Sequence, residues 1–126
     1  MDSINKVELQ GYIGTIRVST ANGTKVANFS LATDLIIKSK DGEPRNETTW
    51  HNVVAWQNKG IANLDNLRKG SLVHITGRVR NNRYTKDGEE RIFNEVYAIT
   101  MDVIKEALPK DSVHTYTTEL PNIPMN

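Results

Sequence analysis

The chain has no cysteine among its 126 residues, which excludes disulfide bonds, zinc–thiolate sites and a cysteine nucleophile. It also lacks an excess of either charge, since 16 lysines and arginines against 15 aspartates and glutamates leave a formal net charge of +1. Any electrostatic binding site must therefore be local. No apolar run is long enough to cross a membrane or to act as a signal peptide, so we expect a cytoplasmic protein without membrane contact.

Aromatic residues are scarce, at 6% of the chain, yet two tryptophans, Trp50 and Trp56, lie six positions apart in one segment. If residues 49–56 form a β-strand, Asn52 and Val54 project from the same face as both tryptophans. Two large π-surfaces separated by a polar side chain favour an exposed platform on which a flat molecule could stack. The alternative is that one tryptophan belongs to the core and the other lies at its rim.

Five segments alternate between apolar and polar residues with the period of a half-buried strand. They cover residues 7–13, 26–37, 49–56, 73–80 and 92–101. Asn22-Gly23 is typical of a tight hairpin turn, because both residues readily take positive φ. The polar segments 38–45 and 81–91 are expected to be loops, each with an Asp-Gly pair near its tip.

One segment, residues 58–67, has the periodicity of a helix, because Ile61, Leu64 and Leu67 recur every three residues. Gly70 is positioned to cap the end of this helix. The order of three strands, one short helix and two strands predicts an all-β protein with the OB-fold, a five-stranded Greek-key barrel with the helix between strands 3 and 4.

Two glycines inside predicted strands, Gly11 and Gly77, suit the strong coiling that a small barrel requires. We therefore assign residues 1–104 to one OB-fold domain. Residues 105–126 contain three prolines and no hydrophobic periodicity, which indicates a flexible C-terminal tail.

Basic side chains cluster in and beside the two predicted loops. Lys38 and Lys40 lie in the first, and Arg78, Arg80 and Arg83 precede Tyr84 in or beside the second. OB barrels bind oligonucleotides or oligosaccharides on one face, with help from their connecting loops. Cations that follow phosphates, together with rings that stack bases at about 1–3 kcal/mol each, are what single-stranded nucleic acid requires.

The alternative for the second loop is that Asp87, Glu89 and Glu90 pair with these cations and leave the loop merely solvated. We expect such pairing for Lys86 and Arg91, which are nearest to the acids in the sequence. It is less expected for Arg78, Arg80 and Arg83, whose immediate neighbours are asparagine, valine and tyrosine.

The sequence gives little support for catalysis. His51, His74 and His114 have no acidic residue at metal-ligand or triad spacing, and no glycine-rich phosphate loop opens a helix. We therefore expect neither an enzyme, nor a metal, nor a cofactor. His51 lies on the strand face opposite the tryptophans and is expected to pack in the barrel or at an interface.

Four motifs together resemble the bacterial single-stranded DNA-binding protein (SSB) family. They are Asn5-Lys6-Val7, the segments 26–33 and 49–54, and residues 67–71. The resemblance covers about residues 4–103. It implies an OB-fold that assembles into homo-oligomers, typically tetramers, and wraps single-stranded DNA.

By position, the resemblance implies that bases stack on Trp50, Trp56 and Tyr84, the same residues that strand parity and loop composition indicate. The basic contacts of the family correspond to Lys40, Lys69, Arg80 and Arg83, to which the loop composition adds Lys38 and Arg78. His51 corresponds to a histidine that the family places near a subunit contact.

Two positions depart from the family pattern. Ile37 stands where a stacking aromatic is common, so a base would be covered there without π-stacking. The chain ends in Ile123-Pro124-Met125-Asn126 without the run of aspartates that precedes the apolar tip of cellular members. Replication and repair proteins remain expected partners through the family, but recruitment through that tip is not expected.

We therefore predict a sequence-independent single-stranded DNA-binding protein that protects exposed strands during DNA replication, recombination and repair, in the cytoplasm and associated with the nucleoid. A primosome-type OB module that mainly docks replication proteins is one alternative, and it predicts weak DNA affinity. An OB domain that binds RNA or an oligosaccharide is another. RNA selectivity requires contacts to the 2′-hydroxyl, and sugar binding would show no salt dependence.

Overall fold

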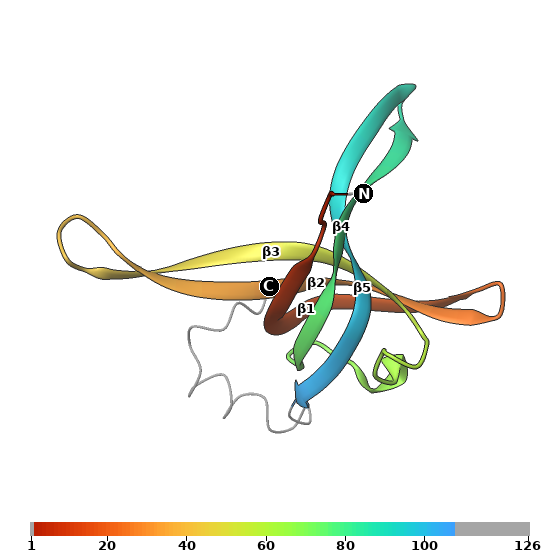
Figure 1. Cartoon of the computed structure of the whole chain (residues 1–126), viewed down its shortest axis with the longest axis horizontal. Coiled ribbons are helices and arrows are strands. Elements are labelled where there is room, and N and C mark those ends of the chain that lie inside the picture. Colours follow the sequence, from red (N-terminus) through yellow and green to blue (C-terminus); the bar gives the residue numbers. More distant parts are fainter. Residues whose placement is uncertain (1, 108–126) are drawn as a thin grey trace.

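The computed structural model describes residues 2–107 as a closed barrel of five strands from which long hairpins project (Figure 1). The elements are β1 (Val7–Ala21), β2 (Thr24–Lys38), β3 (Pro44–Trp56), the 3₁₀ turn η1 (Leu64–Asn66), β4 (Leu72–Lys86) and β5 (Glu89–Lys105). Residues 108–126 of the predicted tail lie outside the described residues, so that part of the domain division stays a prediction.

The strand order around the barrel is β1-β2-β3-β5-β4, and β4 closes onto β1. All pairings are antiparallel except that of β3 with β5, which is parallel and joins Val53 to Val96 and Val54 to Tyr97. The predicted all-β, five-stranded barrel is therefore confirmed, with one parallel pairing that the alternation pattern did not reveal.

Each long strand serves two neighbours, and β1 shows how. Its first half pairs with β4 and its second half with β2, with a bulge between Ile13 and Ile16 where the strand changes direction. Gly11 permits the crossing, because a Cβ atom there would lie 2.1 Å from the carbonyl oxygen of Ala32. Gly77 of β4 has the same role beside the carbonyl oxygen of Tyr97, also at 2.1 Å. The two glycines that the sequence marked are thus needed for close approach of backbones.

The core fills the barrel with the inward residues of every strand. Ala27, Phe29 and Leu31 of β2 are buried in it, as their predicted common face requires. The remaining strands contribute Ile13, Val53, Ala55, Val73, Ile75, Val96, Ala98 and Met101. The connection before β4 seals the barrel with three further buried side chains, Ile61, Leu64 and Leu67.

The predicted helix over 58–67 is wrong, since only the three-residue turn η1 is helical there. The side chain of Gln57 replaces the helical hydrogen bonds. Its Nε2 donates to the carbonyl oxygens of Ile61 and Ala62, at 2.9 and 3.2 Å, and its Oε1 accepts from the N–H of Leu64 at 2.9 Å. The three-residue spacing of apolar residues therefore arises because residues 58–67 form an irregular plug whose apolar side chains are buried, and not because they form a helix. A helix of about ten residues with a glycine and several asparagines has little intrinsic stability.

The predicted loop over 81–91 is also wrong, because β4 and β5 continue as a paired ribbon to a two-residue turn at Asp87-Gly88. Both turn residues have positive φ, of 54° and 79°. The loop predicted at 38–45 shrinks in the same way to residues 39–43. A two-stranded ribbon exposes both faces, so its sequence carries no apolar alternation from which a strand could be predicted.

Helical structure in residues 2–107 is confined to η1, and no helix of this part of the chain could span a bilayer.

We predict that Gln57→Leu lowers the free energy of unfolding by about 2–3 kcal/mol, because three backbone groups lose their partner while the side-chain volume is kept. Urea unfolding followed by tryptophan fluorescence measures the change. Lys59→Ala, which shortens an exposed side chain that has no hydrogen bond or ion pair among the described residues, is the control and should cost less than about 1 kcal/mol. Equal effects of the two substitutions would contradict the role of Gln57.

His51 gives a second prediction. It is half-buried, its Nε2 lies 2.9 Å from the Thr33 hydroxyl, and burial lowers its pKa. The unfolded chain therefore binds this proton near the ordinary value of about 6.5, and the folded protein binds it only at lower pH. The contribution to stability is complete above that value and is lost as the pH falls below it, through the folded pKa. Wild type should lose more stability than His51→Gln between pH 7.5 and 5 in urea unfolding, and parallel curves would contradict this.

Candidate nucleic-acid interface

The outer face of β3 carries both tryptophans, as strand parity predicts. Trp50 is paired with Ala32 of β2 and Trp56 with Val26, while the alternate residues Val53 and Ala55 enter the core. Trp50 is 41% exposed and Trp56 is half-buried, and neither belongs to the core cluster. Six residues of strand separate the two rings by about 20 Å.

The residues next to the Trp50 ring are small. A Cβ atom at Gly14 would lie 2.6 Å from Cζ3 of the indole, so a side chain there would displace the ring. Ala32 is its partner across the ladder, and the Ser30 hydroxyl accepts the N–H of Thr15 at 2.9 Å. Gly14 lies in the bulge of β1 and lets the indole approach this strand closely, while 41% of Trp50 stays exposed.

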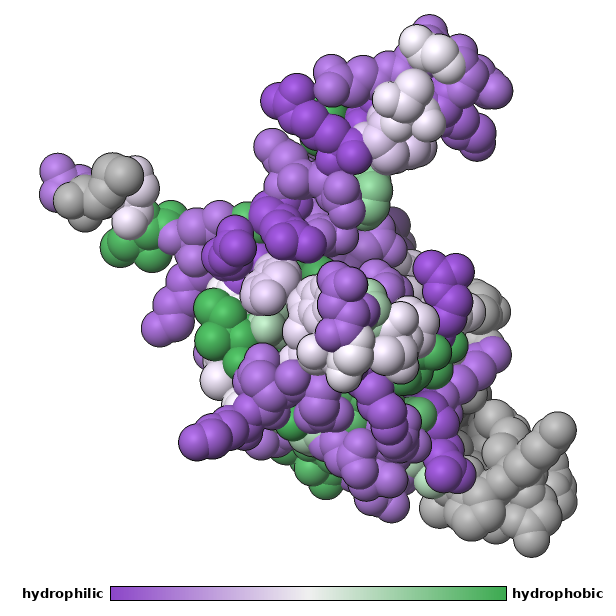
Figure 2. Space-filling model, turned by 90° about the vertical axis from the view of Figure 1, so that its right-hand side faces the viewer, coloured by the Kyte–Doolittle hydropathy of each residue, from purple (hydrophilic) through white to green (hydrophobic). Residues whose placement is uncertain are grey.

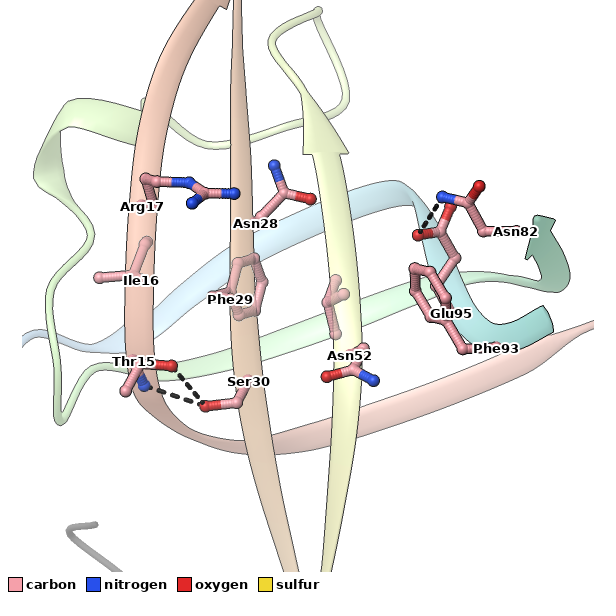
Figure 3. Close-up of a pocket in the computed structure, with 11 residues that line it drawn as sticks. Thr15, Ile16, Arg17, Asn28, Phe29, Ser30, Asn52, Asn82, Phe93 and Glu95 are labelled. Atoms are coloured by element: carbon pink, nitrogen blue, oxygen red, sulfur yellow. Dashed lines mark hydrogen bonds between the residues drawn. The ribbon is translucent and has the colours of Figure 1, made fainter. Parts of the chain in front are cut away.

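A recess of about 400 Å³ lies on this face between β1–β3 and the β4–β5 hairpin (Figure 3). Polar side chains of the three strands line its floor, namely Thr15, Arg17, Asn28, Ser30 and Asn52. Asn82, Phe93 and Glu95 form the wall that the hairpin contributes. Its volume lies within the range of small-ligand sites.

Four residues of this recess were not predicted from the sequence: Arg17, Asn28, Phe93 and Glu95. Arg17 and Asn28 are paired across β1 and β2. Phe93 and Glu95 lie at least fifteen residues after Arg78, where the basic cluster begins. The available signal was the alternation Asn28-Phe29-Ser30-Leu31, in which polar residues interleave with core residues. That pattern identifies an outward face but not what covers it.

The register of the β4–β5 hairpin sorts its predicted cations by face. Arg78 pairs with Tyr97, Arg80 with Glu95 and Tyr84 with Arg91, all on the face that continues from β3. Arg83 alternates to the opposite face. Hydrophilic residues predominate along this upward-projecting hairpin (Figure 2).

A compact network joins the cations of the first face. The guanidinium carbons of Arg78 and Arg80 lie 5.1 and 4.7 Å from the centroid of the Tyr97 ring, within cation–π range. Arg80 Nε also donates to Glu95 Oε2 at 2.5 Å, and Glu95 is only 7% exposed. The charge of Arg80 is therefore largely compensated inside the protein, whereas Arg78 has no ion pair among the residues that the structure describes.

Further along the hairpin, the Tyr84 ring meets Phe93 edge to face, with centroids 5.7 Å apart and planes at 67°. Tyr84 is 43% exposed, so part of its side chain remains accessible.

The predicted pairing of loop acids is confirmed for Arg91, whose Nη2 lies 3.4 Å from Glu89 Oε1. It is wrong for Lys86, which has no ion pair among the described residues. Arg83, for which pairing was less expected, does have a loop acid as partner, because its Nη1 lies 3.6 Å from Glu90 Oε2. The partner of Arg80 is Glu95 and not a loop acid. All four side chains of the two hairpin-tip pairs are exposed, and such pairs contribute at most about 1 kcal/mol, so they leave the cations competent to exchange partners.

The three predicted lysines are not gathered with these arginines. Lys38 ends β2 and Lys40 lies in the following turn, on the β2–β3 hairpin that projects away from the barrel (Figure 1). Lys69 lies in the connection before β4. Ile37 is half-buried on the β2–β3 hairpin, and its neighbours Leu35 and Ile36 are 59% and 66% exposed.

The turn that carries Lys40 is internally braced. The hydroxyl of Ser39 donates to Asp41 Oδ1 and to the carbonyl oxygen of Glu43, and the N–H of Glu43 donates to Asp41 Oδ1 at 3.1 Å. The Ser39 bond and then the Glu43 bond lower the pKa of Asp41. This carboxylate therefore stays charged beside Lys40 at neutral pH.

The curated proteins to which the chain is similar include proteins named single-stranded DNA-binding protein. It is 37% identical over 105 residues to the single-stranded DNA-binding protein of Xylella fastidiosa, covering 80% of this chain and 63% of that protein. It is 33% identical over 105 residues to single-stranded DNA-binding protein 1 of Chlorobaculum tepidum, covering 80% of this chain and 65% of that protein. The chain thus spans somewhat less than two thirds of the length of these curated relatives.

Among solved structures, the SSB of Plasmodium falciparum in complex with ssDNA superposes with a TM-score of 0.67 at 27% identity, over 85% of this chain and 98% of that one. Residues 4–104 match the single-strand binding protein family, which confirms the resemblance drawn from the four sequence motifs. The chain therefore belongs to the single-strand binding protein family.

Proposed function

We propose that this protein binds single-stranded DNA across the outer face of β1–β3 and the β4–β5 hairpin. The single observation that supports this most is the common face of Trp50, Trp56, Arg78 and Tyr84, which the ladder register defines across two separate hairpins. Stacking rings and cations on one continuous surface are the two elements of sequence-independent binding.

The nine residues predicted from the sequence have unequal parts in this proposal. Trp50, Trp56 and Tyr84 stack bases, and Arg78 contacts phosphate. Lys38, Lys40 and Lys69 extend the phosphate path to the β2–β3 hairpin and to the end of the barrel. Arg80 mainly orients Glu95 through their ion pair. Arg83 would contact the phosphates of a DNA strand that crosses to the other face of the β4–β5 hairpin.

The biological setting follows from the family. The protein would cover exposed strands during replication, recombination and repair, in the cytoplasm and with the nucleoid, as a DNA-binding protein and not as an enzyme. A homo-oligomer, most simply a tetramer, would place several such faces on one strand and multiply the affinity without new contacts. Replication and repair proteins are the partners that this setting suggests.

Tryptophan fluorescence during titration with oligo-dT, at low and at moderate salt, tests the proposal. Saturable quenching with an affinity that falls as salt rises is the expected result. An affinity indifferent to salt would favour an oligosaccharide ligand. Absence of quenching at both salt concentrations would favour a module that docks proteins. Tighter binding of oligo-rU than of oligo-dU would favour RNA as the ligand.

Replacing a stacking ring should weaken DNA binding without unfolding the protein. We expect Trp50→Ala and Trp56→Ala each to lower oligo-dT affinity by about 1–3 kcal/mol, the value of one lost stack. Fluorescence anisotropy of a labelled oligonucleotide measures the affinity, and urea unfolding verifies the fold. Ile104→Ala removes an apolar side chain that is 52% exposed at the far end of β5, and it should leave the affinity unchanged.

The two faces of the β4–β5 hairpin should differ in their contribution to salt dependence. Arg78→Gln should reduce the slope of log affinity against log salt by about 0.7, the value for one phosphate contact on a single strand. Arg83→Gln should reduce it less, because Glu90 already compensates that charge. Equal slopes for the two variants would contradict the assignment of the binding face.

A further inference from the structure

The recess between the floor strands and the hairpin has the chemistry of a base-binding site and not of a phosphate site. Its one cation is Arg17, at the β1 side, whereas a carboxylate, Glu95, lies in the opposite wall. Between them lie side-chain amides that both donate and accept hydrogen bonds, and Phe93 adds an aromatic wall. A phosphate next to Glu95 would be repelled, while the edge of an uncharged base would not.

Glu95 is held in a fixed orientation. The residue is 7% exposed, and Oε2 accepts the hydrogen bond from Arg80, whose guanidinium lies over Tyr97. The other oxygen, Oε1, has one long contact of 3.4 Å with Asn82 Nδ2. Because N–H···O bonds of ordinary strength span 2.7–3.2 Å, Oε1 retains capacity to accept a hydrogen bond from a ligand.

Asn52 and Glu95 mark where a base would enter. Both residues also line a second recess of about 260 Å³, which includes Trp50. The two recesses therefore meet at Asn52 and Glu95, beside the Trp50 indole. A DNA strand with one base stacked on Trp50 brings the adjacent base over Asn52 and Glu95.

We propose that this recess reads the hydrogen-bonding edge of a single base and prefers a base with an exocyclic amino group. A carboxylate accepts the N4 amino group of cytosine, and the N6 amino group of adenine offers the same chemistry. Uracil and thymine present a carbonyl oxygen at the corresponding position. This oxygen cannot donate a hydrogen bond, so it would be repelled by the Glu95 carboxylate. The inference rests on the proposed function, to which it adds a base preference superimposed on sequence-tolerant stacking.

Oligo-dC and oligo-dU of equal length test the preference, because the two pyrimidines differ at the edge and not in ring size. At pH 8, where cytosine is uncharged, we expect the full chain to bind oligo-dC about fivefold more tightly than oligo-dU in fluorescence anisotropy at one salt concentration. Equal affinities of wild type for the two oligonucleotides would overturn the inference. Binding of neither at low salt would instead refute the proposed function.

Glu95→Gln keeps the size of the side chain and removes its charge. It should raise the affinity for both oligonucleotides, because Arg80 loses its compensating carboxylate, and it should reduce the preference for oligo-dC to less than about twofold. Glu90→Gln is the matched control, since it removes one charge from the opposite face of the same hairpin. It should retain the full preference.

A preference that survives Glu95→Gln would overturn the assignment of Glu95. If that variant lacks a cooperative urea transition, Asn52→Ala replaces it, because Asn52 is exposed and lines both recesses together with Glu95. In the proposed site the Asn52 amide helps to hold the base against Glu95. Its loss should therefore also reduce the preference to less than about twofold, and an unchanged preference would overturn the inference.

Discussion

The close approach of strands at Gly11 and Gly77 is the constraint on which the rest of the molecule depends. At each position the carbonyl oxygen of a neighbouring strand occupies the space of a side chain, so β1 and β4 can approach their neighbours closely. Strand β1 passes from β4 to β2 along its length, whereas β4 pairs with β5 throughout and with β1 over its first part. Half of each strand closes the barrel and the other half extends into a hairpin. Core and binding surface are therefore built from the same strands, and the period of two sends one set of residues inward and the other outward.

The parts of the structure that depend on local periodicity were predictable from the sequence. The common face of Trp50 and Trp56, the buried face of β2 and the turn at Asn22-Gly23 all follow from alternation or from positive φ. The Arg80–Glu95 pair joins residues fifteen positions apart and depends on the hairpin register, so a prediction of a free phosphate-binding arginine missed it. The helix predicted over 58–67 is wrong for a different reason. The side chain of Gln57 makes hydrogen bonds to this segment that the backbone would make in a helix.

The proposed surface would allow a nearly neutral chain to bind a polyanionic ligand. Arg78 is presented without an acidic partner in the described part of the chain, Arg83 shares its charge with an exposed glutamate, and Arg80 is compensated by a buried one. The net charge of +1 thus hides a graded series of cations on one hairpin. In the proposed site, exposed aromatic rings complement these cations where charge is sparse, as on β3.

The projecting hairpins have a consequence for the distribution of stability. Beyond Ala32 the β2–β3 ribbon has no third strand among the described residues and exposes Leu35 and Ile36, so few buried contacts oppose its separation. Two-stranded ribbons by themselves are marginal in water. Local opening should therefore require little free energy at the ribbon tips and nearly the full free energy of unfolding at Ile13 or Ile75. Backbone amides would accordingly exchange with solvent fastest at the tips, and a ligand would meet adaptable arms on a rigid base.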